Sequence, residues 1–167
     1  MSEETMIRRA LRRWWRAALA DQSVAEEVRD DDTGLSDGLI LSAIASLVIA
    51  LTQSRDWLVW ALAAPIGVAS TALLGLVLAI TTRWVKSSAS WWETTTVVSI
   101  TMLPLLLAVI PVVGVFIGGL AWLLASILVL RHISYLAVND AAVAVLMAVA
   151  IVVIATLGLT FAISAAG

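Results

Sequence analysis

The sequence contains no cysteine and a single histidine. Without cysteine the chain can form no disulfide, no thiolate metal site and no thiol nucleophile. The histidine, His132, cannot hold a metal alone, and as a general base it would need an orienting partner and a nucleophile that its neighbours do not offer. Glycine-rich phosphate loops and paired carboxylates are also missing. We therefore predict no metal, no cofactor and no enzymatic activity.

Charge is scarce as well. Charged residues make up 13% of the 167-residue chain, about half of what a soluble domain carries. In contrast, 62% of the residues are hydrophobic and the mean hydropathy is +1.03. Water cannot solvate the surface of such a chain, so lipid must cover it. The composition predicts an all-α integral membrane protein.

The few charges are concentrated near the N-terminus. Five arginines and no acid fall within residues 8–16, and seven acids with one arginine fall within residues 21–37. The basic block is short and interleaved with apolar residues, so we predict no nucleic-acid partner. We divide the chain into residues 1–34, a cytoplasmic amphipathic helix with an acidic linker, and residues 35–167, a transmembrane domain.

Apolar runs predict a bundle of five transmembrane helices. The first covers residues 35–52, the second residues 57–82 and the last residues 141–165, with polar loops at residues 83–93 and 131–140. The interiors of these spans hold no ionisable residue. This absence disfavours coupled transporters, proton relays and voltage sensors, whereas a passive pore lined by hydroxyls stays possible.

The third and fourth spans come from one apolar run, residues 94–130, which is 37 residues long. A single helix of this length would extend roughly 55 Å, far more than a hydrocarbon core of about 30 Å. A split at Pro111 gives pieces of 17 and 20 residues, and Gly114 permits a tight hairpin turn there. A re-entrant hairpin that enters and leaves from the cytoplasmic side is the alternative.

The distribution of basic residues and tryptophans supports this topology. With five spans and a cytoplasmic N-terminus, nine of the ten basic residues lie in the cytoplasm and only Arg55 lies outside, as the positive-inside rule requires. The C-terminus is then outside. Trp57, Trp91 and Trp92 fall near span ends and are predicted to form part of an aromatic belt at the membrane interface.

Helical periodicity over residues 5–20 predicts an amphipathic helix that lies in the headgroup plane. Ile7, Leu11 and Trp14 are expected to dip into the acyl boundary. The opposite face is expected to bind anionic lipid headgroups, and it carries Arg8, Arg9, Arg12, Arg13 and Arg16. A helix docked on the rest of the protein is the alternative.

Small residues recur at four-residue steps on three spans. Such stripes let helix backbones approach closely in lipid, so we predict that they form helix–helix seams, within the chain or between protomers. They consist of Ser42, Ser46 and Ala50 in the first span, Gly67, Thr71, Gly75 and Ala79 in the second, and Gly114 and Gly118 in the fourth.

Three segments together resemble the Yip1-domain superfamily of five-span membrane proteins. They are the loop with Ser90, Trp91 and Trp92, the run MLPLLLAVIPVVGVFIGGLAWLL, and the turn RHISYLAVNDAAVAVL. The resemblance is to prokaryotic members, which implies the five-span fold and a prokaryotic cytoplasmic membrane. The chain lacks the acidic-aromatic-glycine-proline signature of eukaryotic members, so their GTPase binding is not carried over.

Eukaryotic members of that superfamily associate with one another and act in trafficking and membrane shaping. The resemblance thus implies a non-enzymatic membrane protein that acts by assembly with itself or with membrane partners and by membrane organisation. The expected partners are a bilayer containing anionic lipid and a second copy or another membrane protein. The alternatives are a small passive transporter or channel subunit, or an accessory subunit of a larger membrane complex.

Overall fold

The chain folds into helices joined by short connections. The computed structural model describes residues 6–19, 21, 23–24, 26–27, 33–87, 89–110 and 112–166, and these contain no strand. In chain order the helices are α1 (Met6–Ala18), α3 (Gly34–Gln53), α4 (Trp57–Trp84), α5 (Trp91–Ile100), the 3₁₀ helix η1 (Leu103–Val109), α6 (Val113–Ser134) and α7 (Val138–Ala166). Pro111 lies outside the described residues.

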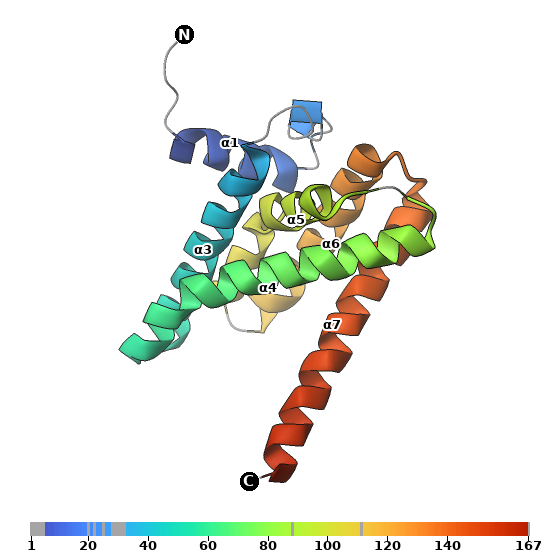
Figure 1. The fold of residues 1–167 in the computed structure, drawn as a ribbon. Coiled ribbons are helices and arrows are strands. Elements are labelled where there is room, and N and C mark those ends of the chain that lie inside the picture. The colour runs from blue at the N-terminus through green and yellow to red at the C-terminus, as the bar shows by residue number, and fades with distance from the viewer. Residues whose placement is uncertain are drawn as a thin grey trace.

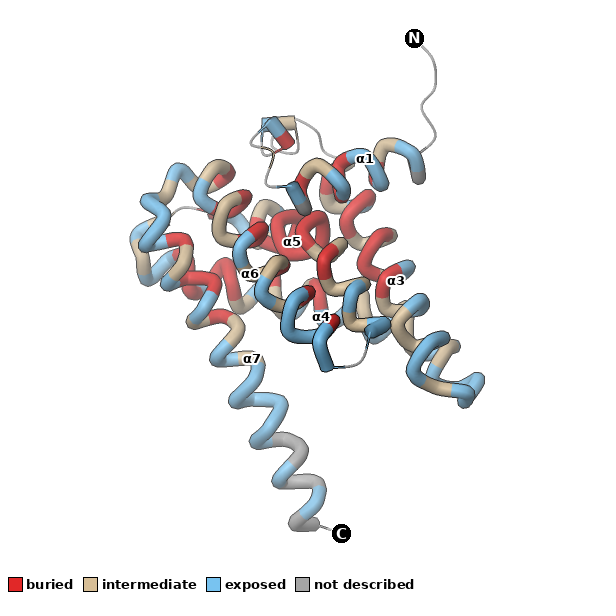
Figure 2. Tube along the Cα trace, turned by 180° about the vertical axis from the view of Figure 1, so that it is seen from behind, coloured by how far each residue is buried: buried red, intermediate tan, exposed pale blue. Residues whose placement is uncertain are grey.

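Four of these helices, α3, α4, α6 and α7, are long and apolar enough to cross a membrane, and α5 with η1 makes a fifth if the pair counts as one bent span. The protein is therefore an all-helical integral membrane protein. In Figure 1, α1 lies at one end of the molecule and the C-terminal end of α7 lies at the opposite end. The outer half of α7 projects beyond the bundle (Figure 2), and its described large apolar side chains, Val153, Ile154, Leu157 and Phe161, are exposed.

Local sequence signals fix where the helices begin and end. The Asp56 side chain caps α4 by accepting a hydrogen bond from the Leu58 amide at 2.9 Å. Ser90 and Glu93 form a reciprocal capping box at the start of α5, which satisfies amides that the first turn leaves unpaired. α6 ends where Tyr135 adopts a left-handed conformation with φ 50°, a common way to stop a helix.

The predicted third span, residues 94–110, is bent and is divided between α5 and η1. α5 ends at Ile100, η1 begins at Leu103, and the two axes differ by 45°. Pro104 explains the break, because it stands in the first turn of η1, where its missing N–H and its ring prevent continuation of the preceding helix. The chain then turns near residue 111, and α6 packs back on η1.

The core lies at the centre of the bundle, between α4, α5, α6 and α7. Residues 94–101, on α5 and just after it, are all buried. A second, smaller cluster joins α1 to α3 and to the start of η1. The N-terminal helix is thus in direct contact with the spanning helices (Figure 1).

The cysteine-free chain allows the topology to be tested with single cysteines and an impermeant thiol reagent applied to intact cells. We expect a cysteine at Ser164 and one at Val113 to react from outside, and one at Ala137 not to react. Reaction of the 137 and 164 positions from the same side would contradict the predicted orientation. If the bent α5–η1 pair is re-entrant while α6 and α7 cross, the sides reverse: position 137 should react from outside, and positions 113 and 164 should not. Protection of position 113 with reaction at position 164 would indicate the re-entrant hairpin over residues 94–130, in which neither half crosses.

Candidate functional site

The most unusual polar feature is where α1 meets α3. One face of α1 is apolar and buried: Ala10, Trp14 and Ala17 lie against the bundle. Ala10 and Trp14 form a cluster with Leu41 and Ala45 of α3. This face holds α1 against the first span, because burying a large aromatic side chain stabilises a contact by a few kcal/mol (about 1.5–3 for a fully buried apolar side chain).

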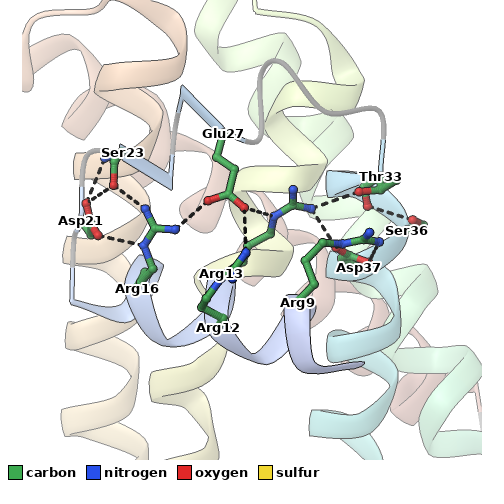
Figure 3. Close-up of polar contacts among 10 residues, drawn as sticks. All are labelled: Arg9, Arg12, Arg13, Arg16, Asp21, Ser23, Glu27, Thr33, Ser36 and Asp37. Carbon is green, nitrogen blue, oxygen red and sulfur yellow. Dashed lines mark hydrogen bonds and ion pairs between the residues drawn. The ribbon is translucent and has the colours of Figure 1, made fainter. Parts of the chain in front are cut away.

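The adjacent face of α1 carries arginines that are paired with carboxylates (Figure 3). Arg9 binds Asp37 with two hydrogen bonds, from Nε at 2.8 Å and from Nη2 at 3.0 Å. Arg13 donates from Nη1 to Asp37 at 2.8 Å and from Nε to Glu27 at 2.9 Å. Arg13 Nη1 also reaches the Thr33 hydroxyl at 3.1 Å. We call these five residues the Asp37 cluster.

Burial sets this cluster apart from an ordinary surface ion pair. Asp37 is 0% exposed and Arg13 is 1% exposed. Charges removed from water are costly unless every one is paired and hydrogen-bonded, and here the Asp37 carboxylate meets two guanidinium groups. Asp37 also lies in the first turn of α3, where the positive end of the helix dipole favours an anion.

A second set of contacts links the end of α1 to the linker. Arg16 donates to Asp21 at 2.9 Å, to Glu27 at 2.6 Å and to the Ser23 hydroxyl. Hydrogen bonds from Ser23 and then from Arg16 lower the pKa of Asp21 to about 2. Burial raises the pKa of Glu27, but hydrogen bonds from Arg13 and Arg16 outweigh it, so the net shift is downward.

These shifts predict how the linker contacts respond to acid. A carboxylate whose pKa is lower in the folded than in the unfolded chain stabilises the fold fully at a pH above its unfolded pKa. The unfolded pKa is 3.8 for Asp21 and 4.5 for Glu27. The stabilisation is lost as the pH falls from that value toward the folded pKa. We expect the stability difference between wild type and Glu27→Gln to stay constant from about pH 8 to 5 and to shrink below about 4.5. Thermal unfolding across that range in detergent measures it. A difference that changes between pH 8 and 6 would contradict this assignment.

The structure changes the predicted role of α1. Trp14 is buried in the protein and not at the acyl boundary, and Arg9, Arg13 and Arg16 contact carboxylates of the same chain instead of facing outward. The physical reason is that a nearby carboxylate at hydrogen-bond distance offers a stronger partner than a screened surface. Arg8 and Arg12 are exposed, and the side chain of Ile7 lies outside the described residues.

The predicted belt tryptophans differ in their surroundings. Trp57 and Trp92 are exposed at the starts of α4 and α5. Trp91 is half-buried. Its indole N–H donates a hydrogen bond to the Ala72 carbonyl of α4 at 3.3 Å, and its ring contacts that of Trp92. The two exposed side chains are therefore available to the membrane interface, whereas Trp91 also ties α5 to α4.

The small-residue stripes lie at contacts between helices of the same chain. A Cβ at Gly67 would overlap Ser46, and one at Gly75 would overlap Thr95 of α5. A Cβ at Gly114 or Gly118 would overlap carbonyl oxygens of η1. Among the other predicted positions, Ser42, Thr71 and Ala79 are buried and Ala50 is half-buried.

Sequence reasoning missed the polar interior of the bundle. Hydroxyls of α5 and its neighbours bond across helices: Thr94 donates to the Gly75 carbonyl at 2.8 Å, and Thr101 pairs with Ser126 at 2.9 Å. Thr81 of α4 donates to the Ala144 carbonyl at 3.0 Å. The run TTTVVSIT was the available signal, because hydroxyls inside lipid-embedded bundles bond neighbouring helices.

No group of three His, Cys, Asp or Glu side chains that could hold a metal ion occurs within the residues that the structure describes. Searches against protein-family models, curated proteins and solved structures gave no match to the chain. The site must therefore be interpreted from its own chemistry.

Proposed function

We propose that the chain is a non-enzymatic integral membrane protein that acts by assembling with itself or with membrane partners and by organising the bilayer. The observation that carries the proposal is the seating of α1 across the end of the bundle, held by the buried Arg13–Asp37 pair at 2.8 Å. A helix fixed there lies along the membrane boundary, where amphipathic helices act on lipid packing. The resemblance to the Yip1-domain superfamily points the same way.

The interior contacts favour this function over a passive pore. A pore needs polar groups that face a water path, whereas the Thr94, Ser99 and Thr101 hydroxyls all bond protein atoms. Two hollows of about 690 and 390 Å³ open on the bundle surface, between α3 and α4 and between α6 and α7. Both are lined mainly by apolar side chains, which suits contact with lipid tails.

Reconstitution into vesicles tests the proposal. We expect the wild-type chain to change vesicle size or to cluster vesicles as its density rises, and to produce no solute flux. The variant Asp37→Asn, inserted at the same density, should lose most of the effect, because α1 is no longer held in place. Cross-linking in the same vesicles reports assembly. Flux that disappears when the hydroxyls at positions 94, 99 and 101 are removed would establish the channel alternative instead.

A further inference from the structure

The hollow of about 690 Å³ between α3 and α4 has the length of a lipid chain. Its walls are mainly apolar, with Ile49 on α3 and Leu62 and Ile66 on α4. The lining extends over residues 46–53 of α3 and residues 58–70 of α4, which at 1.5 Å per residue is roughly 10–18 Å. One leaflet, half of a hydrocarbon core of about 30 Å, has a similar thickness. The hollow is therefore long enough for one acyl chain.

One end of the hollow lies at the turn between α3 and α4, where Gln53 and Ser54 line it. This turn is at the end of α3 that lies away from α1 (Figure 1). Trp57, the first residue of α4, is 72% exposed. Because an exposed tryptophan at the end of a span marks the level of the lipid headgroups, the hollow extends from headgroup level into the hydrocarbon region.

The turn carries two opposite charges side by side. Arg55 and Asp56 are both exposed, and within the part of the chain that the structure describes neither forms an ion pair with the other or with a third residue. Asp56 accepts a hydrogen bond from the Leu58 amide through Oδ1 at 2.9 Å, so Oδ2 is left for another donor. The Ser54 hydroxyl accepts from the Asp56 amide at 3.1 Å, so its own hydrogen is left for an acceptor.

The acidic residues that fall outside the described residues belong to another part of the sequence. All of them precede Gly34, where α3 begins. The turn follows the other end of α3, roughly 30 Å along the helix. The charges at the turn are therefore those of Arg55 and Asp56.

Adjacent charges of opposite sign complement a headgroup that carries both signs. A guanidinium group binds phosphate oxygens through directional hydrogen bonds, and a carboxylate accepts hydrogen bonds from an ammonium group. Neighbouring Cα atoms are about 3.8 Å apart, and two carbons separate the phosphate oxygen from the amine in an ethanolamine headgroup. A choline headgroup has no N–H donor, and a glycerol headgroup has no cation.

We propose that the hollow binds one acyl chain of a phosphatidylethanolamine molecule, whose phosphate contacts Arg55 and Ser54 and whose ammonium group contacts Asp56. The site requires only that α3 and α4 lie in a membrane. It goes beyond the function proposed above for α1 and does not depend on it.

Native mass spectrometry of the full chain in mild detergent tests the headgroup. The probes are dioleoyl phospholipids that differ only in carrying ethanolamine, choline or glycerol. We expect the ethanolamine lipid to bind roughly two- to fivefold more tightly than either of the others, the range that one exposed ion pair supplies. Circular dichroism of each variant below checks that its helices are retained.

Single substitutions separate the two charges. Arg55→Gln should weaken the binding of all three lipids, because each carries a phosphate. Asp56→Asn should remove the preference for ethanolamine over choline, and it should leave the start of α4 in place because asparagine caps a helix about as well as aspartate. Arg83→Gln removes an exposed arginine at the other end of α4 and should leave the preference unchanged.

Two phenylalanine variants on α4 test the hollow itself. Ala63 lines it, so Ala63→Phe should fill part of it and weaken the binding of all three lipids. Ala61 is exposed and is not part of the lining, so Ala61→Phe should bind lipid as the wild type does. A phosphatidylethanolamine with a photoreactive diazirine in its acyl chain should cross-link to Ile49 or Leu62 ahead of Phe116, which is exposed on α6.

Three results would overturn the inference. Equal affinities of the wild-type chain for the three lipids would mean that the headgroup is not recognised. Tightest binding of the glycerol lipid, unaffected by Asp56→Asn, would mean that Asp56 contacts no amine. Disulfides between two copies of an Ile49→Cys chain, with no diazirine cross-link in the hollow, would mean that a second copy fills it. None of these measurements involves α1, so the proposed function is tested separately.

Discussion

Replacing Asp37 with alanine is expected to lower the free energy of unfolding by about 3–5 kcal/mol, because it removes the buried carboxylate that Arg9 and Arg13 share. Arg13 is 1% exposed and cannot turn to water without moving α1. The same change should release α1, which exposes Trp14. Thermal unfolding in mild detergent measures the first effect, and labelling of a cysteine introduced at Ala10 measures the second.

Two variants separate this effect from a general loss of charge. Asp140 also lies in the first turn of a spanning helix, α7, but is exposed, so Asp140→Ala should cost less than about 1 kcal/mol. Adding Arg13→Met to Asp37→Ala should recover part of the loss, because it removes the buried guanidinium that no longer has the Asp37 carboxylate beside it. Two results would show that the buried Arg13–Asp37 pair does not hold α1. One is an equal loss of unfolding free energy in Asp37→Ala and Asp140→Ala. The other is strict additivity of the losses caused by Arg13→Met and Asp37→Ala.

Replacing Gly75 with alanine is expected to destabilise the bundle by about 1–3 kcal/mol, the usual cost of overpacking a tight core. A Cβ there would lie 2.6 Å from the Thr95 Cα and would overlap the Thr95 hydroxyl. Backbone is in the way, so α4 and α5 would have to separate. The Thr94 hydrogen bond to the Gly75 carbonyl would weaken with them.

Gly119 provides a matched control on α6. A Cβ at Gly119 meets no atom within 4 Å, so Gly119→Ala should be neutral or stabilising by up to about 1 kcal/mol through helix propensity. Thermal stability of both variants in the same detergent makes the comparison. We expect Gly75→Ala to lower the melting temperature and Gly119→Ala to leave it unchanged or raise it. A loss of equal size at both would mean that glycine is needed for a reason other than the α4–α5 contact.

The spanning helices could be predicted from sequence because hydropathy alone determines them. Residues 35–52 and 57–82 correspond to Gly34–Gln53 and Trp57–Trp84, and the last span begins at Val138, three residues before its predicted start. The turn between η1 and α6 also lies near the predicted residue. The bend after Ile100 was not predicted, because Pro104 lies inside a continuous apolar run, and hydropathy does not report the helix break that a proline causes there.

The Asp37 cluster could not be predicted from periodicity. An amphipathic pattern tells which residues share a face, but it does not tell whether lipid, water or a carboxylate of the same chain covers that face. Five arginines on one helix predict a lipid-binding surface when the carboxylates that follow in the chain are not considered as their partners. The opposite signs of the neighbouring blocks at residues 8–16 and 21–37 were the available signal, since adjacent blocks of opposite charge favour pairing.

The order of the Asp37 cluster along the chain has a consequence for biogenesis. The ribosome makes Arg9 and Arg13 before Glu27 and Asp37, so a nascent chain carries these arginines unpaired until the start of α3 has emerged. During that interval they carry the positive charge that the predicted orientation, with a cytoplasmic N-terminus, requires. Once α3 has inserted, the same guanidinium groups close on Asp37. The guanidinium groups that are free of Asp37 while the chain is being made are therefore the ones that hold α1 to α3 in the finished fold.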